Sequence, residues 1–136
     1  MKEEISTGII LFNDNKKRKF LLLNYPSKHW DFVKGKMEKG ETFHETALRE
    51  TNEETGIKDV EFLDGFKEEI DYYFRVNNQD IHKKVIFFLG KTETTNIILS
   101  HEHLDFIWLD FDNALDKITY ENAKNLLRKS KEFLDN

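Results

Sequence analysis

Three glutamates lie close together in a segment whose pattern is typical of a helix. Glu50, Glu53 and Glu54 are spaced i, i+3 and i+4, so they occupy neighbouring positions on one helical surface. Carboxylates at this spacing repel one another, and burying them without a counter-charge is costly. A dense group of oxygen ligands suits a hard divalent cation. The residues therefore predict a metal site, with Mg²⁺ as the expected ion and Mn²⁺ as the alternative.

The helical geometry directs part of this acidic group toward the protein interior. At about 100° per residue, Phe43 and Ala47 mark the weakly apolar arc of the helix. Glu50 and Glu54 fall within about 20° of Phe43, and Glu53 lies at the side of the arc. A solvated face is the usual explanation for a glutamate-rich helix, because glutamate is mostly exposed. The angular positions instead indicate a cleft wall.

A loop rich in glycine and lysine precedes this helix. Residues 34–41 contain two glycines and three lysines, directly before the predicted helix N-terminus. Backbone amides and the helix dipole favour anions at such a position. A glycine- and lysine-rich loop by itself is more often a simple turn. Next to the acidic helix, however, it predicts a place where a metal ion and a phosphate meet.

The elements that position these groups have clear signals in the sequence. Thr42 is an expected N-cap, Glu45 completes a capping box, and Gly56 marks the end, so the helix is predicted over 42–55. Apolar spacings of three and four predict a second amphipathic helix over 121–134. Strands are predicted over 5–12, 20–25, 60–63, 70–75, 85–89 and 106–109.

Strands that surround one helix and lead to a second one predict an α/β fold, with a mixed sheet between helices in α/β/α layers. The first two strands are expected to form an antiparallel hairpin. The strand order does not follow from the sequence. With 136 residues, the chain is expected to form a single domain over 1–136.

The composition excludes several classes of protein. The net charge of −5 argues against binding of long nucleic acid, which requires an excess of lysine and arginine. The chain has no cysteine, so it has neither disulfides nor a thiolate zinc site. The sequence shows no signal peptide and no apolar run of membrane-spanning length. These features predict a cytoplasmic protein that does not bind a membrane, and it is expected to be a monomer.

The acidic helix and the preceding loop resemble the signature of the Nudix hydrolase family, G-x5-E-x7-R-E-U-x-E-E-x-G-U, in which U is aliphatic. The matching residues are Gly35, Glu41, Arg49, Glu50, Glu53, Glu54, Gly56 and Ile57. Thr51 stands at the first U position and is the single departure. So many matches over a short segment make this resemblance specific.

The resemblance implies an α/β/α sandwich that hydrolyses a nucleoside diphosphate linked to another group. It also implies that the three helical glutamates bind divalent cations, that Arg49 orients them with help from Glu41, and that the Gly35 carbonyl completes a metal shell. Arg49, Glu53 and Glu54 are thus the expected catalytic residues within the signature. The cations would polarise the phosphoryl oxygens.

Segments outside the signature resemble the asymmetrical diadenosine tetraphosphate hydrolases of this family. The most distinctive of them is Ser100-His101-Glu102-His103. This resemblance makes Glu102 an additional metal ligand or the general base, and the sequence leaves that choice open. A plain loop acid is the alternative.

The same resemblance implies a set of substrate-binding residues. His29, Lys34 and either Lys83 or Lys84 are expected to contact the polyphosphate, with Lys83 preferred. Tyr72 and Phe106 are expected to stack on adenine, although an aromatic residue in a strand is as often part of the core. The subgroup usually has Tyr where this chain has Phe106, and Pro where it has Val33.

The leading functional hypothesis is hydrolysis of diadenosine tetraphosphate to AMP and ATP. Removal of pyrophosphate from RNA 5′ ends, or cleavage of another nucleoside diphosphate derivative, is the enzymatic alternative. A nucleotide-sensing module that binds without cleaving is the non-enzymatic alternative. The retention of every signature carboxylate favours an enzyme. The expected partner is a small nucleotide or dinucleoside polyphosphate.

Overall fold

Two long strands, β1 (Lys2–Asn13) and β7 (Gln79–Lys91), form the centre of one mixed sheet in the computed structural model, which describes residues 1–136. The two strands pair in parallel along most of their length. Because side chains alternate across a strand, Ile10 contributes to the core on one face of the sheet and Ile9 to the core on the other. The apolar run of β1 therefore stabilises both layers.

Six further strands complete the sheet, and all of them pair in antiparallel fashion. β2 pairs with β1, β3 and β8, whereas β7 pairs with β5 and β6, and β4 pairs with β1. Their bounds are β2 (Lys19–Asn24), β3 (Trp30–Asp31), β4 (Val33–Lys36), β5 (Glu61–Phe62), β6 (Glu68–Val76) and β8 (Asp105–Leu109). The prediction of a mixed sheet is confirmed.

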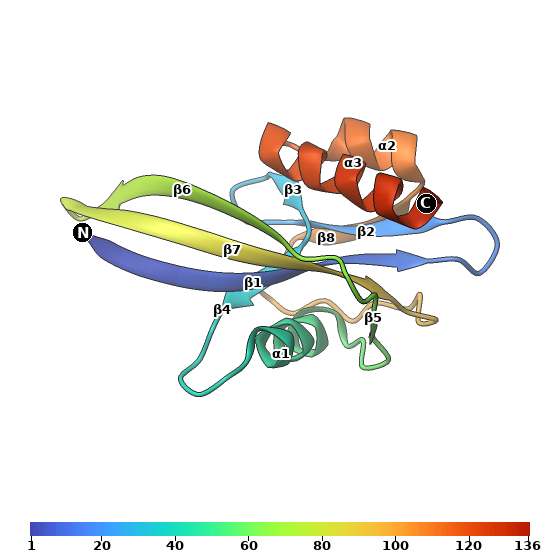
Figure 1. Ribbon diagram of the computed structural model, residues 1–136, viewed down its shortest axis with the longest axis horizontal. Coiled ribbons are helices and arrows are strands. Elements are labelled where there is room, and N and C mark those ends of the chain that lie inside the picture. The colour runs from blue at the N-terminus through green and yellow to red at the C-terminus, as the bar shows by residue number, and fades with distance from the viewer.

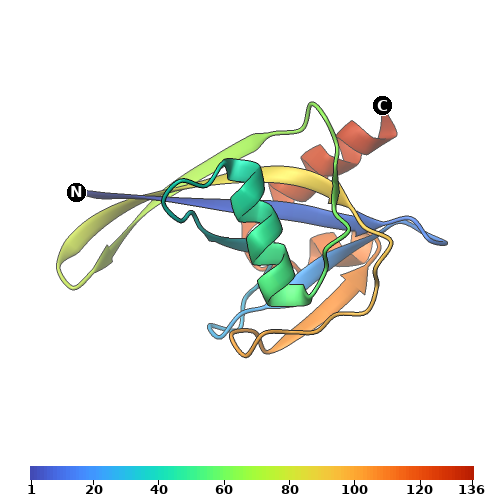
Figure 2. The same cartoon turned by 90° about the horizontal axis from the view of Figure 1, so that it is seen from below.

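Helices cover both faces of this sheet, as predicted. α1 (Phe43–Thr55) packs on one face, and α2 (Phe111–Lys117) and α3 (Glu121–Asp135) pack on the other (Figure 1). Seen from below, α1 crosses the strands and α3 lies behind them, while the β6–β7 hairpin extends beyond the helices (Figure 2). The α/β/α layering places the acidic helix alone on its side.

Several local features differ from the sequence-based expectations, among them the short strand β3 at residues 30–31, where no strand was predicted. Residues 33–36 were expected in a loop, but they form β4 because they pair with residues 6–9 of β1. α2 has no counterpart among the predicted elements, since it is short and Asp110, the N-cap before its first residue, is its main sequence signal. β7 begins at Gln79 instead of residue 85, because its polar half pairs with β6 and does not follow an apolar pattern.

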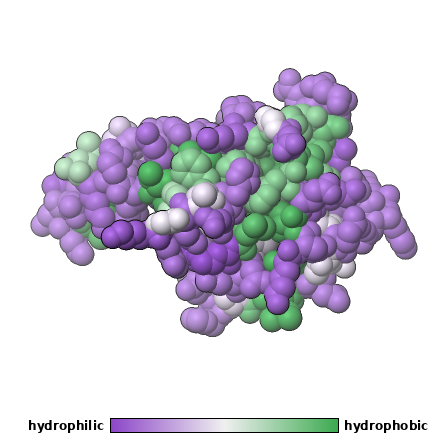
Figure 3. Space-filling model, turned by 60° about the horizontal axis from the view of Figure 1, so that its bottom comes forward, coloured by the Kyte–Doolittle hydropathy of each residue, from purple (hydrophilic) through white to green (hydrophobic).

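None of the three helices combines the length and the apolar character that a membrane crossing needs. Hydrophilic residues cover much of the face in Figure 3, and apolar atoms break this surface mainly in the middle and right of the view. The most exposed large apolar side chains are those of Met1 and Ile98, each 77% exposed.

α1 has well-formed ends, which fix the acidic helix relative to the sheet. The Thr42 hydroxyl accepts a hydrogen bond from the Glu45 amide at 3.1 Å, and the Glu45 carboxylate accepts one from the Thr42 amide at 2.8 Å. At the other end, Gly56 has a φ of 78°, which glycine adopts without steric cost. Both predicted helix signals are confirmed.

Replacing Thr42 by Ala is expected to lower the free energy of unfolding by about 1 kcal/mol, because the capping hydroxyl is lost. Urea unfolding followed by circular dichroism measures this change. Thr95→Ala is the matched control, since Thr95 is exposed and its hydroxyl makes no hydrogen bond. An equal loss in both variants would contradict a specific role for the cap.

Candidate metal and substrate site

Arg49 connects the acidic residues of α1 to the loop before the helix. Its Nε lies 2.7 Å from Glu41 Oε2, and its Nη1 lies 2.9 Å from Glu50 Oε1 and 3.2 Å from Glu53 Oε2. Its Nη2 also donates to the Lys36 carbonyl at 2.9 Å. The hydrogen bond from Arg49 lowers the pKa of Glu41 to about 2. With a further ion pair to Glu38 at 3.4 Å, one guanidinium therefore holds four carboxylates and the end of β4.

Glu54 lacks such a counter-charge. Its side chain is buried, with 5% of the residue exposed, and its Oε2 has no hydrogen-bond partner. Burial, together with the negative charges of Glu50 and Glu102, raises the pKa of Glu54 to about 9. An unpartnered, buried carboxylate next to other carboxylates is a group whose ionised form a bound cation would stabilise.

Gly35 allows the backbone of β4 to approach α1. A Cβ atom at this position would lie 2.0 Å from Glu50 Cδ, which no side chain tolerates. The Glu50 carboxylate therefore fits directly against the strand only because residue 35 is glycine. The predicted metal ligands Gly35, Glu50 and Glu54 are thus brought together from two elements.

The segment after β7 adds Glu102 and His103 to this group. The amides of Ile98 and Ser100 donate to the carbonyls of Thr55 and Glu54, at 2.9 and 3.2 Å. These bonds satisfy carbonyls that the end of a helix leaves open, and so they fix the segment on α1. The negative charge of Glu102 consequently raises the pKa of Glu54.

His103 is a member of the site that the sequence reasoning did not select. Its imidazole is buried, with Nε2 3.8 Å from Glu54 Oε1 and its ring edge-on to Tyr25 at 4.7 Å. The Tyr25 hydroxyl in turn donates to the Phe32 carbonyl. The Ser-His-Glu-His segment pointed to this part of the chain, but only Glu102 was predicted from it as a site residue.

The donor set fits a hard divalent cation in chemistry, since it consists of carboxylate oxygens and a backbone carbonyl. Glu50 and Glu53 each direct an oxygen to Arg49, and nowhere in the chain do three acidic or histidine side chains form a closed cage. The residues that could hold a cation are therefore Gly35, Glu50, Glu53, Glu54 and Glu102.

A cavity of about 460 Å³ lies on the other face of the sheet, beside the start of α3. This volume is in the range of small-molecule sites. The lining residues are His29, Asp31, Lys34, Ile70, Tyr72, Lys83, Tyr120 and Asn122. Four of the five residues that the sequence predicted to bind substrate thus share one cavity.

The cavity receives its positive charge from two lysines. Lys34 Nζ lies 3.0 Å from Asp31 Oδ2, and Lys83 pairs with Tyr72 across the β6–β7 ladder. Burial lowers the pKa of Lys83, and the nearby charge of Lys34 lowers it further. Lys84 points to the opposite face because side chains alternate along β7. Of the two candidate lysines, the structure places Lys83 in the cavity.

Tyr120 is the second aromatic residue of this cavity, and it was not predicted. It precedes the first residue of α3 and is 53% exposed. His29 lies between it and Tyr25, with ring centroids 5.4 Å from Tyr120 and 4.7 Å from Tyr25. An aromatic residue at an N-cap position, where Ser, Thr, Asp or Asn is usual, was the available signal.

Phe106 does not join Tyr72 in the structure. It pairs with Leu23 on β2 and packs with the apolar cluster on the α1 side of the sheet. Tyr72 packs against the cluster on the side of α2 and α3. The two predicted stacking residues therefore lie on opposite faces of the sheet, because the side chain of Tyr72 points to one face of β6 and that of Phe106 to the other face of β8.

Comparison with known proteins agrees with this geometry. The NUDIX domain matches residues 2–130. The chain belongs to the Nudix family. The asymmetrical bis(5'-nucleosyl)-tetraphosphatase of Rattus norvegicus is 36% identical, with 93% of this chain and 92% of the rat protein covered. An RNA pyrophosphohydrolase of Pelagibacter ubique is 28% identical, with 94% and 91% covered.

Solved structures share the fold of this Nudix protein. The crystal structure of a C. elegans Ap4A hydrolase binary complex matches with a TM-score of 0.84 and 28% identity, and the match covers 97% of this chain and 98% of that one. Family membership makes the chain a Nudix hydrolase, an enzyme that cleaves a phosphoanhydride bond in a nucleotide with a divalent cation. The predicted fold and enzyme class are confirmed.

The pKa of Glu54 makes the stability of the metal-free protein depend on pH. In the folded chain Glu54 has a pKa of about 9. In the unfolded chain its pKa is the ordinary glutamate value of about 4.3. The folded state therefore binds more protons in this window, so the free energy of unfolding falls as pH rises, by at most about 1.4 kcal/mol per pH unit.

Urea unfolding in EDTA, at several pH values between about 5 and 8, tests this expectation. Glu54→Gln should flatten the slope, whereas Glu132→Gln, on the exposed face of α3, should leave it unchanged. Added Mg²⁺ should raise the stability of the unmodified chain most at the alkaline end. An identical slope in Glu54→Gln would show that another group causes the dependence.

Proposed function

We propose that this Nudix hydrolase cleaves diadenosine tetraphosphate (Ap4A) asymmetrically to AMP and ATP, with Mg²⁺ as its cation. The relatives named for this activity support the substrate, since they match over nearly the whole chain. The observation that carries the proposal is that two consecutive residues of β4, Lys34 and Gly35, face the two sides of the sheet. Lys34 lines the aromatic cavity on one face of the sheet, and Gly35 lies against the acidic helix on the other.

This arrangement suits a long polyanion with a nucleoside at its end. β4 pairs only with β1, so its outer edge is open to a phosphate chain that passes from one face to the other. In our proposal, Tyr72 and Tyr120 hold the adenine, and Lys34, Lys83 and His29 contact the phosphates in the cavity. The rest of the chain then reaches the acidic helix, where one phosphoanhydride bond is cleaved by water.

The acidic residues have distinct proposed roles. Glu50, Glu53, Glu54 and the carbonyl of Gly35 are the groups that would hold the cations. When bound, divalent cations polarise phosphoryl oxygens and neutralise charge that develops during displacement. Arg49 keeps Glu50 and Glu53 in place, and Glu41 keeps Arg49 in place.

Glu102 is the proposed general base. It comes from an exposed segment that faces Glu54 and is not engaged by Arg49. An exposed carboxylate can accept a proton from the attacking water and return it to solvent. The oxygen of that water forms the new bond to phosphorus, and the bridging oxygen leaves with the departing nucleotide.

A second substrate class has its own support. The Pelagibacter relative is named as an RNA pyrophosphohydrolase and matches over most of both chains. A triphosphorylated RNA 5′ end also presents a base followed by phosphates. The acidic net charge of −5 favours the smaller substrate. Equal enzyme concentrations assayed on both substrates distinguish the two activities.

Pure protein with Ap4A and Mg²⁺ is expected to release AMP and ATP in equal amounts, as measured by ion-exchange chromatography, and EDTA is expected to stop the reaction. Glu54→Gln should lower the rate on the order of 10³-fold, because a charge next to the reacting phosphate is lost. Glu132→Gln is the matched control. Formation of two ADP molecules would reject the asymmetrical reaction, and near-normal turnover of Glu54→Gln would reject the site.

The neighbouring lysines Lys83 and Lys84 provide an internal comparison. Lys83→Ala should raise KM for Ap4A about tenfold, because a charged hydrogen bond to phosphate is lost from the cavity. Lys84→Ala should change KM little, since this side chain lies on the other face of the sheet. Steady-state kinetics of both variants measure the difference, and equal effects would contradict the proposed path of the substrate.

A further inference from the structure

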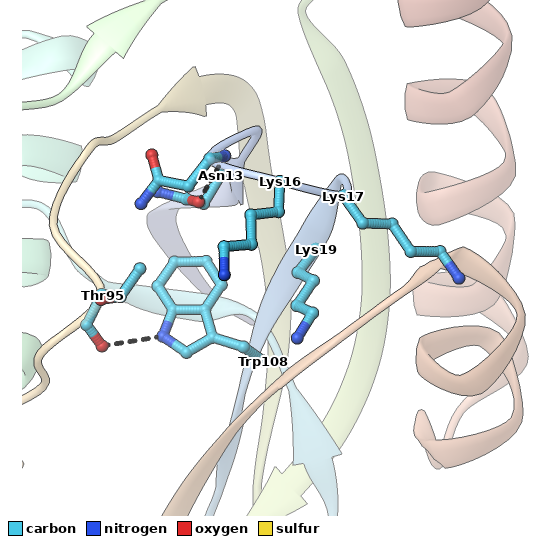
Figure 4. Close-up of a pocket in the computed structure, with 7 residues that line it drawn as sticks. Asn13, Lys16, Lys17, Lys19, Thr95 and Trp108 are labelled. Carbon is cyan, nitrogen blue, oxygen red and sulfur yellow. Dashed lines mark hydrogen bonds between the residues drawn. The ribbon is translucent and has the colours of Figure 1, made fainter.

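A second cavity lies at the end of the sheet where β1 turns into β2. It has a volume of about 410 Å³ and is formed by the tip of the β1–β2 hairpin, the end of β8 and the segment after β7 (Figure 4). No acidic side chain lines it. The lining residues are Asn13, Asn15, Lys16, Lys17, Lys19, Thr95 and Trp108.

The cavity concentrates positive charge in a chain whose net charge is −5. Residues 16–19 are four consecutive basic residues at the hairpin tip. Lys17 and Arg18 each form an ion pair with an aspartate 3.0 Å away. Lys16 and Lys19 have no carboxylate partner, and both extend along the side of Trp108 in Figure 4. Two ammonium groups without a carboxylate partner therefore line the same cavity as one aromatic ring.

Trp108 is held as a fixed wall of the cavity. Its indole Nε1 donates to the Thr95 carbonyl at 3.1 Å, and its backbone pairs with Leu21 on β2. The indole nitrogen therefore already has its partner, and the half-buried ring packs against the apolar cluster on the α1 side while also lining the cavity. Aromatic faces of this kind bind nucleobases without regard to their sequence.

We propose that this cavity is a second binding site for a nucleoside phosphate. The base stacks on Trp108, the phosphate lies between Lys16 and Lys19, and the free side-chain amide of Asn15 adds a polar contact. The cavity volume fits one small ligand, and the negative net charge disfavours a longer nucleic acid. A purely inorganic anion would leave the aromatic wall unused.

The site is separate from the catalytic one. Thr7 of β1 lies opposite Gly35, and the strand continues for six residues to Asn13, which corresponds to about 20 Å. A mononucleotide bound at the hairpin tip therefore cannot also contact Gly35. The proposed site therefore does not depend on the substrate assigned to the catalytic site.

Nuclear magnetic resonance of the full chain can test this site, because the protein has only two tryptophans, Trp30 and Trp108. Trp108→Phe assigns the two indole N–H signals. AMP is the probe, since it contains no phosphoanhydride bond. Titration with AMP is expected to shift the Trp108 signal with saturation, and the double variant Lys16→Ala/Lys19→Ala should weaken this binding about tenfold or more.

Two controls keep the result specific. Lys39→Ala/Lys58→Ala removes two exposed lysines elsewhere and should leave the Trp108 titration unchanged. Lys83→Ala alters the other cavity and should also leave it unchanged. The Lys16→Ala/Lys19→Ala variant should retain the basal hydrolase turnover, which shows that it folds.

Several outcomes would overturn the proposal. The first is no saturable shift of the Trp108 signal, and the second is a shift that Lys16→Ala/Lys19→Ala does not weaken. Equal affinity for inorganic phosphate would show a simple anion site. Binding of a short oligoadenylate without binding of AMP would show a nucleic-acid surface in place of a mononucleotide site.

Discussion

The structure depends on how negative charge is accommodated on one face of α1. Glu50, Glu53 and Glu54 repel one another, and Glu54 is buried without a hydrogen-bond partner for one of its oxygens. Arg49 compensates the outer carboxylates but not Glu54, so the pKa of Glu54 rises. A bound divalent cation would supply the positive charge that Glu54 lacks.

The surrounding elements meet this constraint in different ways. β4 lacks a side chain at Gly35, so the Glu50 carboxylate can lie against the strand. The segment at 98–103 closes the carbonyl end of α1 by backbone hydrogen bonds and brings Glu102 to Glu54. The capping box of Thr42 and Glu45 fixes the opposite end. The acidic group is therefore held by backbone contacts at both ends of the helix and beside it.

Charge is also distributed unevenly over the rest of this Nudix hydrolase. The chain is acidic as a whole, yet lysines gather at two cavities, each next to aromatic rings. An anionic ligand would be repelled by most of the surface and attracted at these places. Local charge, and not net charge, thus selects where a polyanion can bind. Alternation along β4 and β7 then decides which lysine faces which side.

The sequence by itself determined the acidic helix, its caps, the mixed α/β/α architecture and the family, because each depends on local spacing or on a contiguous motif. Only the tertiary structure decided which residues meet from distant segments. It placed Tyr120 instead of Phe106 beside Tyr72, and Lys83 instead of Lys84 in the cavity. The physical reason is strand alternation and pairing. The face that a side chain occupies depends on the register of its strand with strands that are distant in the sequence, and no short sequence pattern determines this register.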